Sequence, residues 1–249
     1  MLKQQLQQIR NQDRISSQAV LSYLFTDFIE LHGDRVLGDD GTLTGGIAFL
    51  EGLPVTVLAV NRRTITLSKE IVNGGMVTVS GYKKAHRLIQ AAQRFDRPVI
   101  SLIDMPGADA SVYSEQHGQS QAIADVIADM GELTSPNIAI FLGEGHSGGA
   151  LAFANSNRIL MLEQALFSVA SPEAVSAIVT GDDLNQYLPM TASALAEVGL
   201  VDDIIKEDQN VLQNIKSALL RQLTPLQKEA GSELIELRQH KFLKVLDLF

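Results

Sequence analysis

Apolar residues recur along the chain with two spacings, and these predict a mixture of helices and strands. Over residues 17–32 they recur every three or four positions, which predicts an amphipathic helix. The same spacing predicts a helix over 80–95, with Ser80 as a possible N-cap, and another over 115–133. Further helices are predicted over 1–13 and within GGALAFANS, SPEAVSAIVTG and TASALAEVG.

Apolar runs bounded by turn residues predict the strands. Two β-rich runs, 43–52 and 53–62, meet at Glu51-Gly52, which favours a hairpin. The largely apolar runs 98–104 and 137–143 are typical of strands buried on both faces, and NRILMLEQALFSVAS adds short strands. Strands and helices alternate from 54 to 205, which predicts one α/β domain with layered sheets.

The last forty residues, 209–249, predict two helices that break near Pro225. An apolar stripe marks the second half of this tail, at Leu226, Leu234, Leu237, Leu243 and Leu246. The stripe fits packing on the same chain, and it equally fits a subunit interface.

Composition narrows the class of protein. The 249 residues are 45% hydrophobic and 20% charged, as in ordinary globular proteins. A net charge of −9 argues against a general nucleic-acid binder. The chain has no Cys, so we expect neither disulfides nor a Cys-based metal site. The polar N-terminus lacks a signal-peptide core and no run suggests a membrane span, so a soluble cytoplasmic protein is expected.

Two segments share one design, in which an apolar strand ends in a glycine-containing turn and opens a helix. They are PVISLID-MPGA and NIAIFLG-EGHSGGA. Because ligands of α/β folds bind at the carboxyl ends of strands, two such loops side by side would direct several backbone N–H groups to one point. That arrangement is an oxyanion hole, in which one lost donor costs about 3–4 kcal/mol of barrier. Glycine lets a ligand approach the backbone closely.

The second segment also fits the G-x-S-x-G pattern of a nucleophile elbow, with Ser147 as the nucleophile. A serine nucleophile needs a histidine base and an acid. His240 is the only histidine after Ser147, and its surroundings, ELRQHKF, look like a helix face. His117 and His146 precede the serine, and the histidine spacing gives no metal motif. Backbone donors are therefore favoured over a serine nucleophile, with the side chain of His146 lining the site.

Basic residues gather before the first of these loops, at Lys69, Lys83, Lys84 and Arg87. They would suit a phosphate-bearing ligand, and they would equally suit a solvated helix face.

Taken together, these segments resemble the family of carboxyltransferase alpha subunits of bacterial acetyl-CoA carboxylase. The resemblance extends over about 25–205 in both order and spacing. Its segments are FTDFIELHGDR, GGIAFLEGLPV, GYKKAHRLIQAAQRFDRPVISLIDMPGA, HGQSQAIA, GEGHSGGALA and SVASPEA.

The resemblance implies a crotonase/ClpP-like α/β fold, a superhelix of ββα units with layered sheets plus N- and C-terminal helices. It implies one domain over 1–249, with N-terminal helices (1–32), a crotonase-like core (43–206) and a helical tail (209–249). It implies an α2β2 assembly in which a beta subunit, usually with a zinc ribbon, completes the active site. No metal is expected in this chain. Biotin carboxylase and the biotin carboxyl carrier protein are the further implied partners.

The implied reaction moves the carboxyl group of carboxybiotin to acetyl-CoA and yields malonyl-CoA for fatty acid biosynthesis. The implied backbone donors are Gly107, Ala108, Gly145 and His146. The implied substrate contacts are Gly148, Gly149, Lys83 and Lys84. Two alternatives remain: a crotonase-fold serine hydrolase or peptidase using Ser147, and a catalytically impaired scaffold within a carboxylase complex.

The sequence departs from the family pattern in both loops. The family usually has glycine where His146 stands, so a bulky side chain is expected to enter the site. The family's DTPGAYPG is here DMPGADAS, which introduces Met105, Asp109, Ala110 and Ser111. A GRETKE-like loop is replaced by RTITLSKE.

Overall fold

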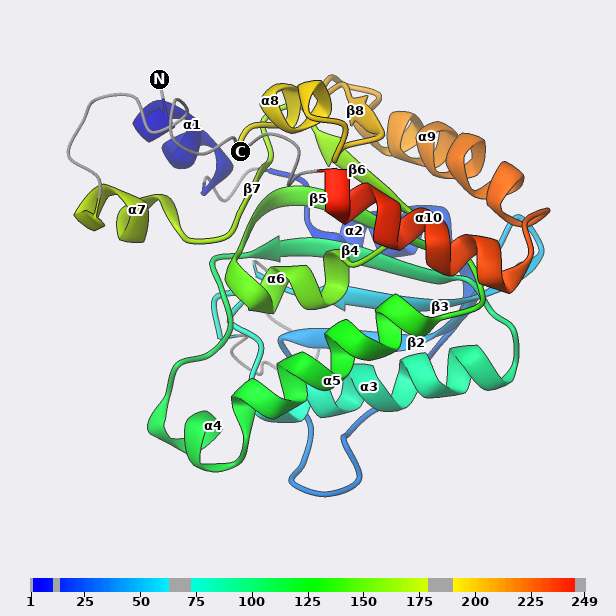
Figure 1. The fold of residues 1–249 in the computed structure, drawn as a ribbon, viewed down its shortest axis with the longest axis horizontal. Coiled ribbons are helices and arrows are strands. Elements are labelled where there is room, and N and C mark those ends of the chain that lie inside the picture. The colour runs from blue at the N-terminus through cyan, green and yellow to red at the C-terminus, as the bar shows by residue number, and fades with distance from the viewer. Residues whose placement is uncertain (1, 11–13, 63–72, 179–189, 245–249) are drawn as a thin grey trace.

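A mixed eight-stranded β-sheet forms the centre of the molecule (Figure 1). The computed structural model describes residues 2–10, 14–62, 73–178 and 190–244. The strands are β1 (Thr26–Glu30), β2 (Leu43–Leu50), β3 (Leu53–Val60), β4 (Val99–Met105), β5 (Asn137–His146), β6 (Arg158–Leu162), β7 (Leu166–Ser168) and β8 (Asp203–Ile205).

The strand order is β1-β2-β3-β4-β5-β6-β8, with β7 pairing to β5. The β1–β2 and β2–β3 pairs are antiparallel, and the remaining pairs are parallel. The hairpin predicted at Glu51-Gly52 is confirmed, since Leu50 pairs with Leu53. Because β4 and β5 are parallel neighbours, with Met105 opposite Gly145, the two glycine-containing turns leave the sheet at the same edge.

Helices cover both faces of the sheet. Figure 1 shows α3, α5 and α6 side by side on the near face, with α10 above α5. On the other face, α2 packs on β3 and β4 and contacts α9. The helices are α1 (Leu2–Ile9), α2 (Ser17–Leu24), α3 (Val79–Arg94), α4 (Val112–Gln116), α5 (Gln119–Glu132), α6 (Ser147–Ala154), α7 (Pro172–Ile178), α8 (Ala192–Glu197), α9 (Val211–Leu226) and α10 (Gly231–Leu243).

The single amphipathic helix predicted over 17–32 is wrong. The helix ends at Leu24, and the chain continues as β1 against the edge of β2. Gly46 makes this pairing possible, because a Cβ there would stand 2.2 Å from the backbone oxygen of Ile29. Pairing with β1 gives hydrogen-bond partners to the backbone groups at the edge of β2, and this gain outweighs the local preference of 26–30 for a helix. The structure thus replaces half of a predicted helix with an edge strand.

Two further predictions need correction at helix boundaries. Thr78 occupies the N-cap position of α3, where Ser80 was predicted. The helix predicted over 115–133 is two helices, α4 and α5, separated at Gly118, whose φ is +88°. Glycine adopts that left-handed conformation without strain, so the turn forms there.

β5 is longer than the predicted run 137–143 and, besides β4, pairs with two further strands. Its first half pairs with β6, and its second half, Glu144 to His146, pairs with β7. The extension is fully buried, like the rest of the strand. The strand therefore delivers Gly145 and His146 to the edge where the predicted site lies, and the second pairing fixes their backbone.

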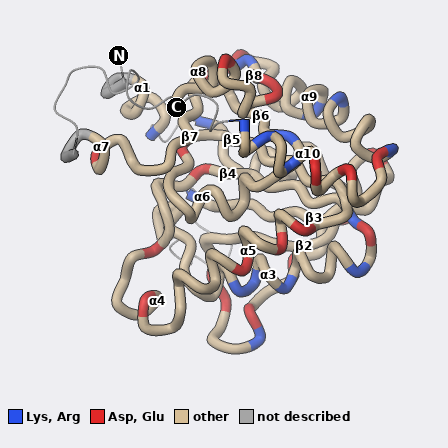
Figure 2. Tube along the Cα trace, in the orientation of Figure 1, with Lys and Arg blue, Asp and Glu red and all other residues tan. Residues whose placement is uncertain are grey.

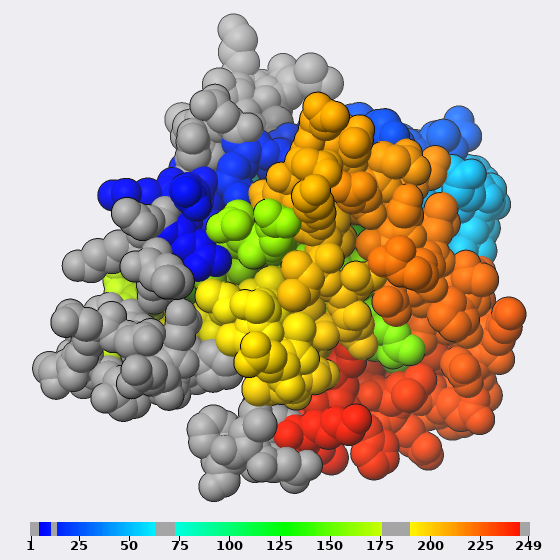
Figure 3. Space-filling model, turned by 90° about the horizontal axis from the view of Figure 1, so that it is seen from above, coloured from blue at the N-terminus to red at the C-terminus, as the bar shows by residue number. Residues whose placement is uncertain are grey.

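The C-terminal tail forms the two predicted helices, and Pro225 lies in the last turn of α9. Figure 3 shows α9 in orange and α10 in red forming one continuous surface. Leu226 and Leu234 are buried in the core of the same chain, whereas Leu237 and Leu243 are exposed. The stripe therefore divides between packing on the chain and the outer surface; Leu246 lies outside the described residues. No helix in the described ranges is both long and apolar enough to cross a membrane.

Candidate functional site

The two glycine-containing turns meet at Gly149 and Ala108. A Cβ added to Gly149 would stand 2.9 Å from the Ala108 nitrogen and 3.0 Å from its Cβ. Real Cβ atoms do not tolerate backbone contacts that short, so glycine is required for α6 and the 106–109 turn to touch. The structure thus brings together the two segments that the sequence pattern paired.

The N-terminus of α6 lacks a side-chain cap. His146 occupies the N-cap position and its side chain makes no capping hydrogen bond. The first N–H groups of a helix have no partners within the helix, and they bear the positive end of its dipole. Figure 2 shows no charged residue on α6 itself. This helix end is therefore a set of polarised donors suited to an anion.

Ser147 begins α6 in a strained conformation. Its φ is +63°, a left-handed value that few residues other than glycine adopt. The side chain is exposed, and Gly148 beside it is partly exposed. The nucleophile-elbow pattern therefore does produce a sharp strand-to-helix turn, and its result is to turn the start of α6 outward.

The 106–109 turn is open at Gly107 and anchored at Asp109. Gly107 has a φ of +151°, and a Cβ there would meet nothing within 4 Å, so a ligand has room to approach the backbone. Asp109 donates its N–H to the carbonyl of Val77 at 2.9 Å. The Gln119 amide donates to the carbonyls of Val77 and Asp109, at 2.9 and 3.0 Å. Ala108 is thus followed directly by a residue whose backbone N–H and carbonyl are both hydrogen-bonded.

Asp109 accounts for part of the departure from the family pattern. Its carboxylate accepts hydrogen bonds from Ser111, from Ser114 at 2.6 Å and from Asn73 at 3.2 Å. Burial alone would raise the pKa of Asp109, but these hydrogen bonds hold it below its usual range. The carboxylate therefore stays ionised and ties the turn to the start of α4 and to the segment before α3.

His146 does not enter the site. Its ring is 1% exposed and lies between Glu144, whose Oε2 is 3.0 Å from Nε2, and Ser168, whose Oγ is 2.8 Å from Nδ1. Ser168 donates its own hydrogen to the carbonyl of Ala170, so its oxygen accepts from the histidine. The expected intrusion of a bulky side chain is therefore wrong: the extended backbone of β5 points the ring into the protein.

Glu144 is the buried centre of a charged cluster beneath the two turns. Arg10 donates to both of its carboxylate oxygens at 2.8 Å, and Arg62 donates to Oε1. Arg62 also lies 3.4 Å from Asp104. Burial alone would raise the pKa of Glu144, but hydrogen bonds from His146 and Arg10 and the charge of Arg62 hold it well below its usual range. The cluster clamps the end of β5 to the chain that follows α1.

The residues that the structure describes form no catalytic triad around Ser147. Both ring nitrogens of His146 are committed inside the protein. His117 is exposed at the end of α4, with Nδ1 2.7 Å from the carbonyl of Tyr113, and His240 is exposed on α10. Among the described residues, no hydrogen bond joins Ser147 to a histidine. Backbone donors remain the chemistry that this turn offers.

The basic residues before the first turn have separate positions. The Lys84 ammonium is fully buried and binds Asp39 and the carbonyl of Asp40. Arg87 donates to the carbonyls of Leu31 and Gly33 at 2.9 and 2.8 Å. Lys84 and Arg87 both bind the 31–40 loop. The Lys84 ammonium is therefore not available for the predicted substrate contact in this structure. Lys83 is partly exposed, 3.3 Å from the carbonyl of His117, and Lys69 lies outside the described residues.

Sequence reasoning missed the residues that hold the turns from below: Glu144, Asp104, Gln119 and Tyr82. A Cβ on Gly143 would stand 2.2 Å from the Asp104 carboxylate, which accepts the N–H of Glu144 at 3.2 Å. A charged residue at the end of an apolar strand was the available signal for both carboxylates. Tyr82 and Gln119 gave no such signal, because each looked like an ordinary position on a helix.

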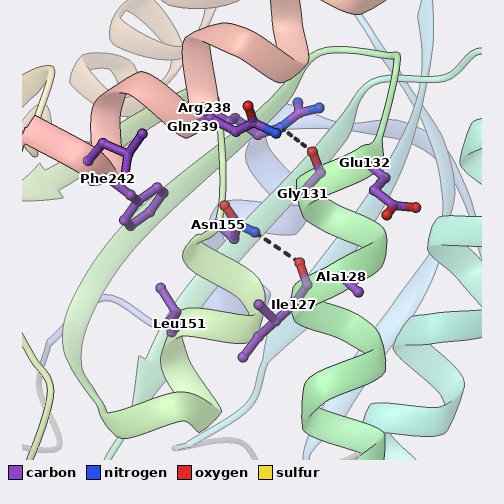
Figure 4. A pocket seen from close by; sticks show the side chains of 10 residues that line it. Ile127, Ala128, Gly131, Glu132, Leu151, Asn155, Arg238, Gln239 and Phe242 are labelled. Carbon is purple, nitrogen blue, oxygen red and sulfur yellow. Dashed lines mark hydrogen bonds between the residues drawn. The ribbon is translucent and has the colours of Figure 1, made fainter.

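A separate pocket of about 650 Å³ lies between α5, α6 and α10 (Figure 4). Its lining includes Ile127, Leu151 and Phe242, and Asn155 donates to the carbonyl of Ile127 at 2.9 Å. Leu151 belongs to the second half of α6 and Asn155 is its C-cap residue, so this pocket does not include the uncapped helix start. Within the described residues, no three side chains of metal-binding type gather to form a metal site.

Comparisons with known proteins identify relatives of this chain. The family described as acetyl co-enzyme A carboxylase carboxyltransferase-like matches residues 2–246. The acetyl-coenzyme A carboxylase carboxyl transferase subunit alpha of Geobacter metallireducens is 40% identical, over 97% of this chain and 80% of the relative. The subunit of the same name from Streptococcus pyogenes is 38% identical, over 96% of this chain and 97% of the relative.

Solved structures show the same fold at low sequence identity. Transcarboxylase 12S, with hydrolysed methylmalonyl-coenzyme A bound, superposes with a TM-score of 0.71 at 20% identity, over 90% of this chain and 44% of that one. A Pseudomonas malonate decarboxylase hetero-dimer superposes with a TM-score of 0.69 at 20% sequence identity, over 85% of this chain and 91% of that one. These likenesses confirm the predicted crotonase-like α/β architecture.

Proposed function

The chain belongs to the acetyl co-enzyme A carboxylase carboxyltransferase-like family, and from this we propose that it is the alpha subunit of an acetyl-CoA carboxylase carboxyltransferase. It transfers the carboxyl group of carboxybiotin to acetyl-CoA, and the product is malonyl-CoA. The observation that supports the chemistry is the contact between Ala108 and Gly149, which sets one turn's N–H groups against an uncapped helix start.

The chain's own contribution is to stabilise negative charge. When carboxybiotin loses CO2, charge remains on its ureido oxygen. We propose that the N–H groups of Gly107 and Ala108 bind this oxygen, with the start of α6 adding the field of its dipole. The backbone at Gly145 and His146 supports the second turn. Each such donor is worth roughly 100- to 1000-fold in rate.

The proton balance requires no side-chain base from this chain. The biotin anion takes a proton from the acetyl-CoA methyl group, and the resulting thioester enolate captures CO2. The absence of a triad around Ser147, in the part of the chain that the structure describes, therefore fits this proposal. A serine hydrolase would require a base that His146, His117 and His240 do not supply.

Two observations support this proposed site for the ureido oxygen. The space above Gly107 is open, since a Cβ there would meet nothing within 4 Å. Asp109, the nearest carboxylate in sequence, is bound by Ser111, Ser114 and Asn73. Its charge is thus screened by hydrogen bonds.

We also propose the assembly in which this chemistry operates. The relatives are named as subunits, which implies partner chains. The proposed partner is a carboxyltransferase beta subunit with a zinc ribbon, in an α2β2 assembly that holds most of acetyl-CoA on the beta side. A biotin carboxyl carrier protein would deliver carboxybiotin made by biotin carboxylase. Residues 1–249 would form one carboxyltransferase domain, working in the cytoplasm.

Reconstitution tests this function. The chain is mixed with a beta subunit and biotin, and decarboxylation of malonyl-CoA is followed. Biotin-dependent turnover by the complex, with none from the chain alone, is the expected result. An assembled complex without turnover would favour a scaffold, and hydrolysis of an acyl-CoA by the chain alone would favour the hydrolase.

A further inference from the structure

Tyr82 lies directly beneath the contact between the two turns. It belongs to α3, is 0% exposed, and stacks on Phe153 of α6 with ring centroids 5.4 Å apart. Its ring is therefore held by packing between two helices, and its hydroxyl has a fixed position.

The hydroxyl reaches the point where the turns touch. A Cβ on Gly149 would stand 2.8 Å from the Tyr82 hydroxyl oxygen and 2.9 Å from the Ala108 nitrogen. The hydroxyl and the Ala108 N–H thus border the same small space, next to the start of α6. The tyrosine is directed at the proposed anion site from inside the protein.

This hydroxyl has no hydrogen-bond partner within the described residues. A buried hydroxyl without a partner destabilises a folded protein, and a phenylalanine would give the same packing without that cost. Burial, with the charge of Asp40, raises the pKa of Tyr82 well above its usual value, so the group stays neutral. It therefore keeps an O–H hydrogen that can turn toward a negative charge.

We propose that Tyr82 is a positioning residue of the anion site: its hydroxyl spaces Ala108 from Gly149 and turns its O–H dipole toward the oxygen that the N–H groups of Gly107 and Ala108 bind. The inference rests on the proposed function. A dipole in a dry site stabilises charge that grows in the transition state more than it stabilises the bound ground state. Loss of the Tyr82 hydroxyl should therefore lower kcat and leave KM unchanged.

Tyr82→Phe tests this in the assembled complex, with Tyr23→Phe as the matched control. Tyr23 lies on α2, on the opposite face of the sheet, and its hydroxyl donates to Gln213 at 2.9 Å. For Tyr82→Phe, kcat for biotin-dependent decarboxylation of malonyl-CoA is expected to fall about tenfold. Its KM values should stay within about twofold and its Tm should equal or exceed that of the wild type. Tyr23→Phe should leave kcat unchanged.

A kcat within about twofold of the wild type overturns the inference. So does a fall in kcat matched by a fall in Tm, because that pattern shows a structural hydroxyl. A double-mutant cycle adds a check on geometry. The Cβ of Gly149→Ala meets the Tyr82 hydroxyl, so adding Tyr82→Phe should recover part of the Tm that Gly149→Ala loses. If the changes in Tm of the two single variants simply add in the double variant, the proposed spacing is overturned.

A second readout separates this inference from the proposed function. Biotin labelled with ¹³C at the ureido carbonyl is bound to the wild-type and Tyr82→Phe complexes, and the infrared carbonyl stretch is compared. A higher frequency in Tyr82→Phe supports the inference, because the carbonyl has lost a favourable dipole. Such a shift without turnover by the wild type rejects the proposed function alone. Identical frequencies overturn the inference, and no binding by the wild type overturns both.

Discussion

The His146 ring lies 3.0 Å from the Glu144 carboxylate, inside the protein and away from Ser147. The two residues are separated by Gly145 alone, and their side chains share one side of an extended strand. This pairing turns the histidine into a support for the strand end. Only the backbone of His146 is then left for the contact proposed at the second turn.

Gly149 is expected to be intolerant of any side chain. In Gly149→Ala the new Cβ would meet the Ala108 nitrogen at 2.9 Å and the Tyr82 hydroxyl at 2.8 Å. Overpacking of this kind costs about 1–3 kcal/mol of unfolding free energy. We expect kcat of the complex to fall by at least about 100-fold, because the donors separate.

Gly148→Ala is the matched control for Gly149→Ala. Its Cβ would lie 3.7 Å from Ile123 at the closest, an ordinary contact. Urea unfolding and steady-state kinetics compare the two variants. Equal losses in both would contradict the requirement for close approach at Gly149.

Ser147→Ala separates backbone chemistry from serine chemistry. The hydroxyl has no histidine partner in the described structure, and alanine keeps the backbone N–H. We expect kcat of the complex to change by less than about fivefold. A loss of about 10⁴-fold or more, measured on a complex of unchanged assembly, would instead identify a nucleophile.

Glu144→Ala should strongly destabilise the chain. It removes the carboxylate that pairs with Arg10, Arg62 and His146 in a fully buried position. Leaving buried charges unpaired costs about 3–5 kcal/mol of unfolding free energy. Glu173→Ala is the control, because Glu173 pairs with Arg10 at 2.6 Å while 57% exposed. Exposed ion pairs contribute about 0–1 kcal/mol to stability. If Glu173→Ala loses as much unfolding free energy as Glu144→Ala, the burial of Glu144 is not what makes its ion pairs important.

Stability should fall in acid because of the same carboxylate. The pKa of Glu144 is lower in the folded chain than its ordinary value of 4.5. Its contribution is thus fully present above the unfolded pKa and is lost as the pH falls below about 5 toward the folded pKa. The difference in unfolding free energy between the wild type and Glu144→Gln, measured by urea unfolding, should therefore decrease as the pH is lowered from 7 to 3. A gap that is constant with pH would contradict the assignment.

Lys84 and Lys83 should behave differently although they are adjacent. Lys84→Met removes the buried partner of Asp39 and is expected to lower the free energy of unfolding by about 1–3 kcal/mol. KM for malonyl-CoA in the complex should stay within about twofold, because the ammonium faces the 31–40 loop. Lys83→Met should leave stability within about 0.5 kcal/mol. A large rise in KM for Lys84→Met alone would restore it as a substrate contact.

The local pattern of the sequence predicts much of this fold for a simple reason. The buried strands β4 and β5 and the hairpin of β2 and β3 have apolar runs and turn residues that few other structures accommodate. The paired turns were predicted in the same way, because parallel neighbours place their carboxyl ends together. The helix over 17–32 failed because pairing with β2 decides the conformation of 26–30, and that partner is distant in sequence.

The sequence by itself determined the residue types of the site: glycines where backbone must approach backbone, an apolar strand before each turn, and no histidine placed to serve Ser147. Only the tertiary structure decided where side chains point. It turned His146 toward Glu144, committed Lys84 to Asp39, and set the unpaired hydroxyl of Tyr82 against Gly149 and Ala108. Packing between distant segments decides most of this: Lys84 lies 45 residues from Asp39 in sequence, and Arg10, which helps to hold Glu144, lies 134 residues from it. Local pattern determines which elements form, and long-range contacts determine which atoms meet.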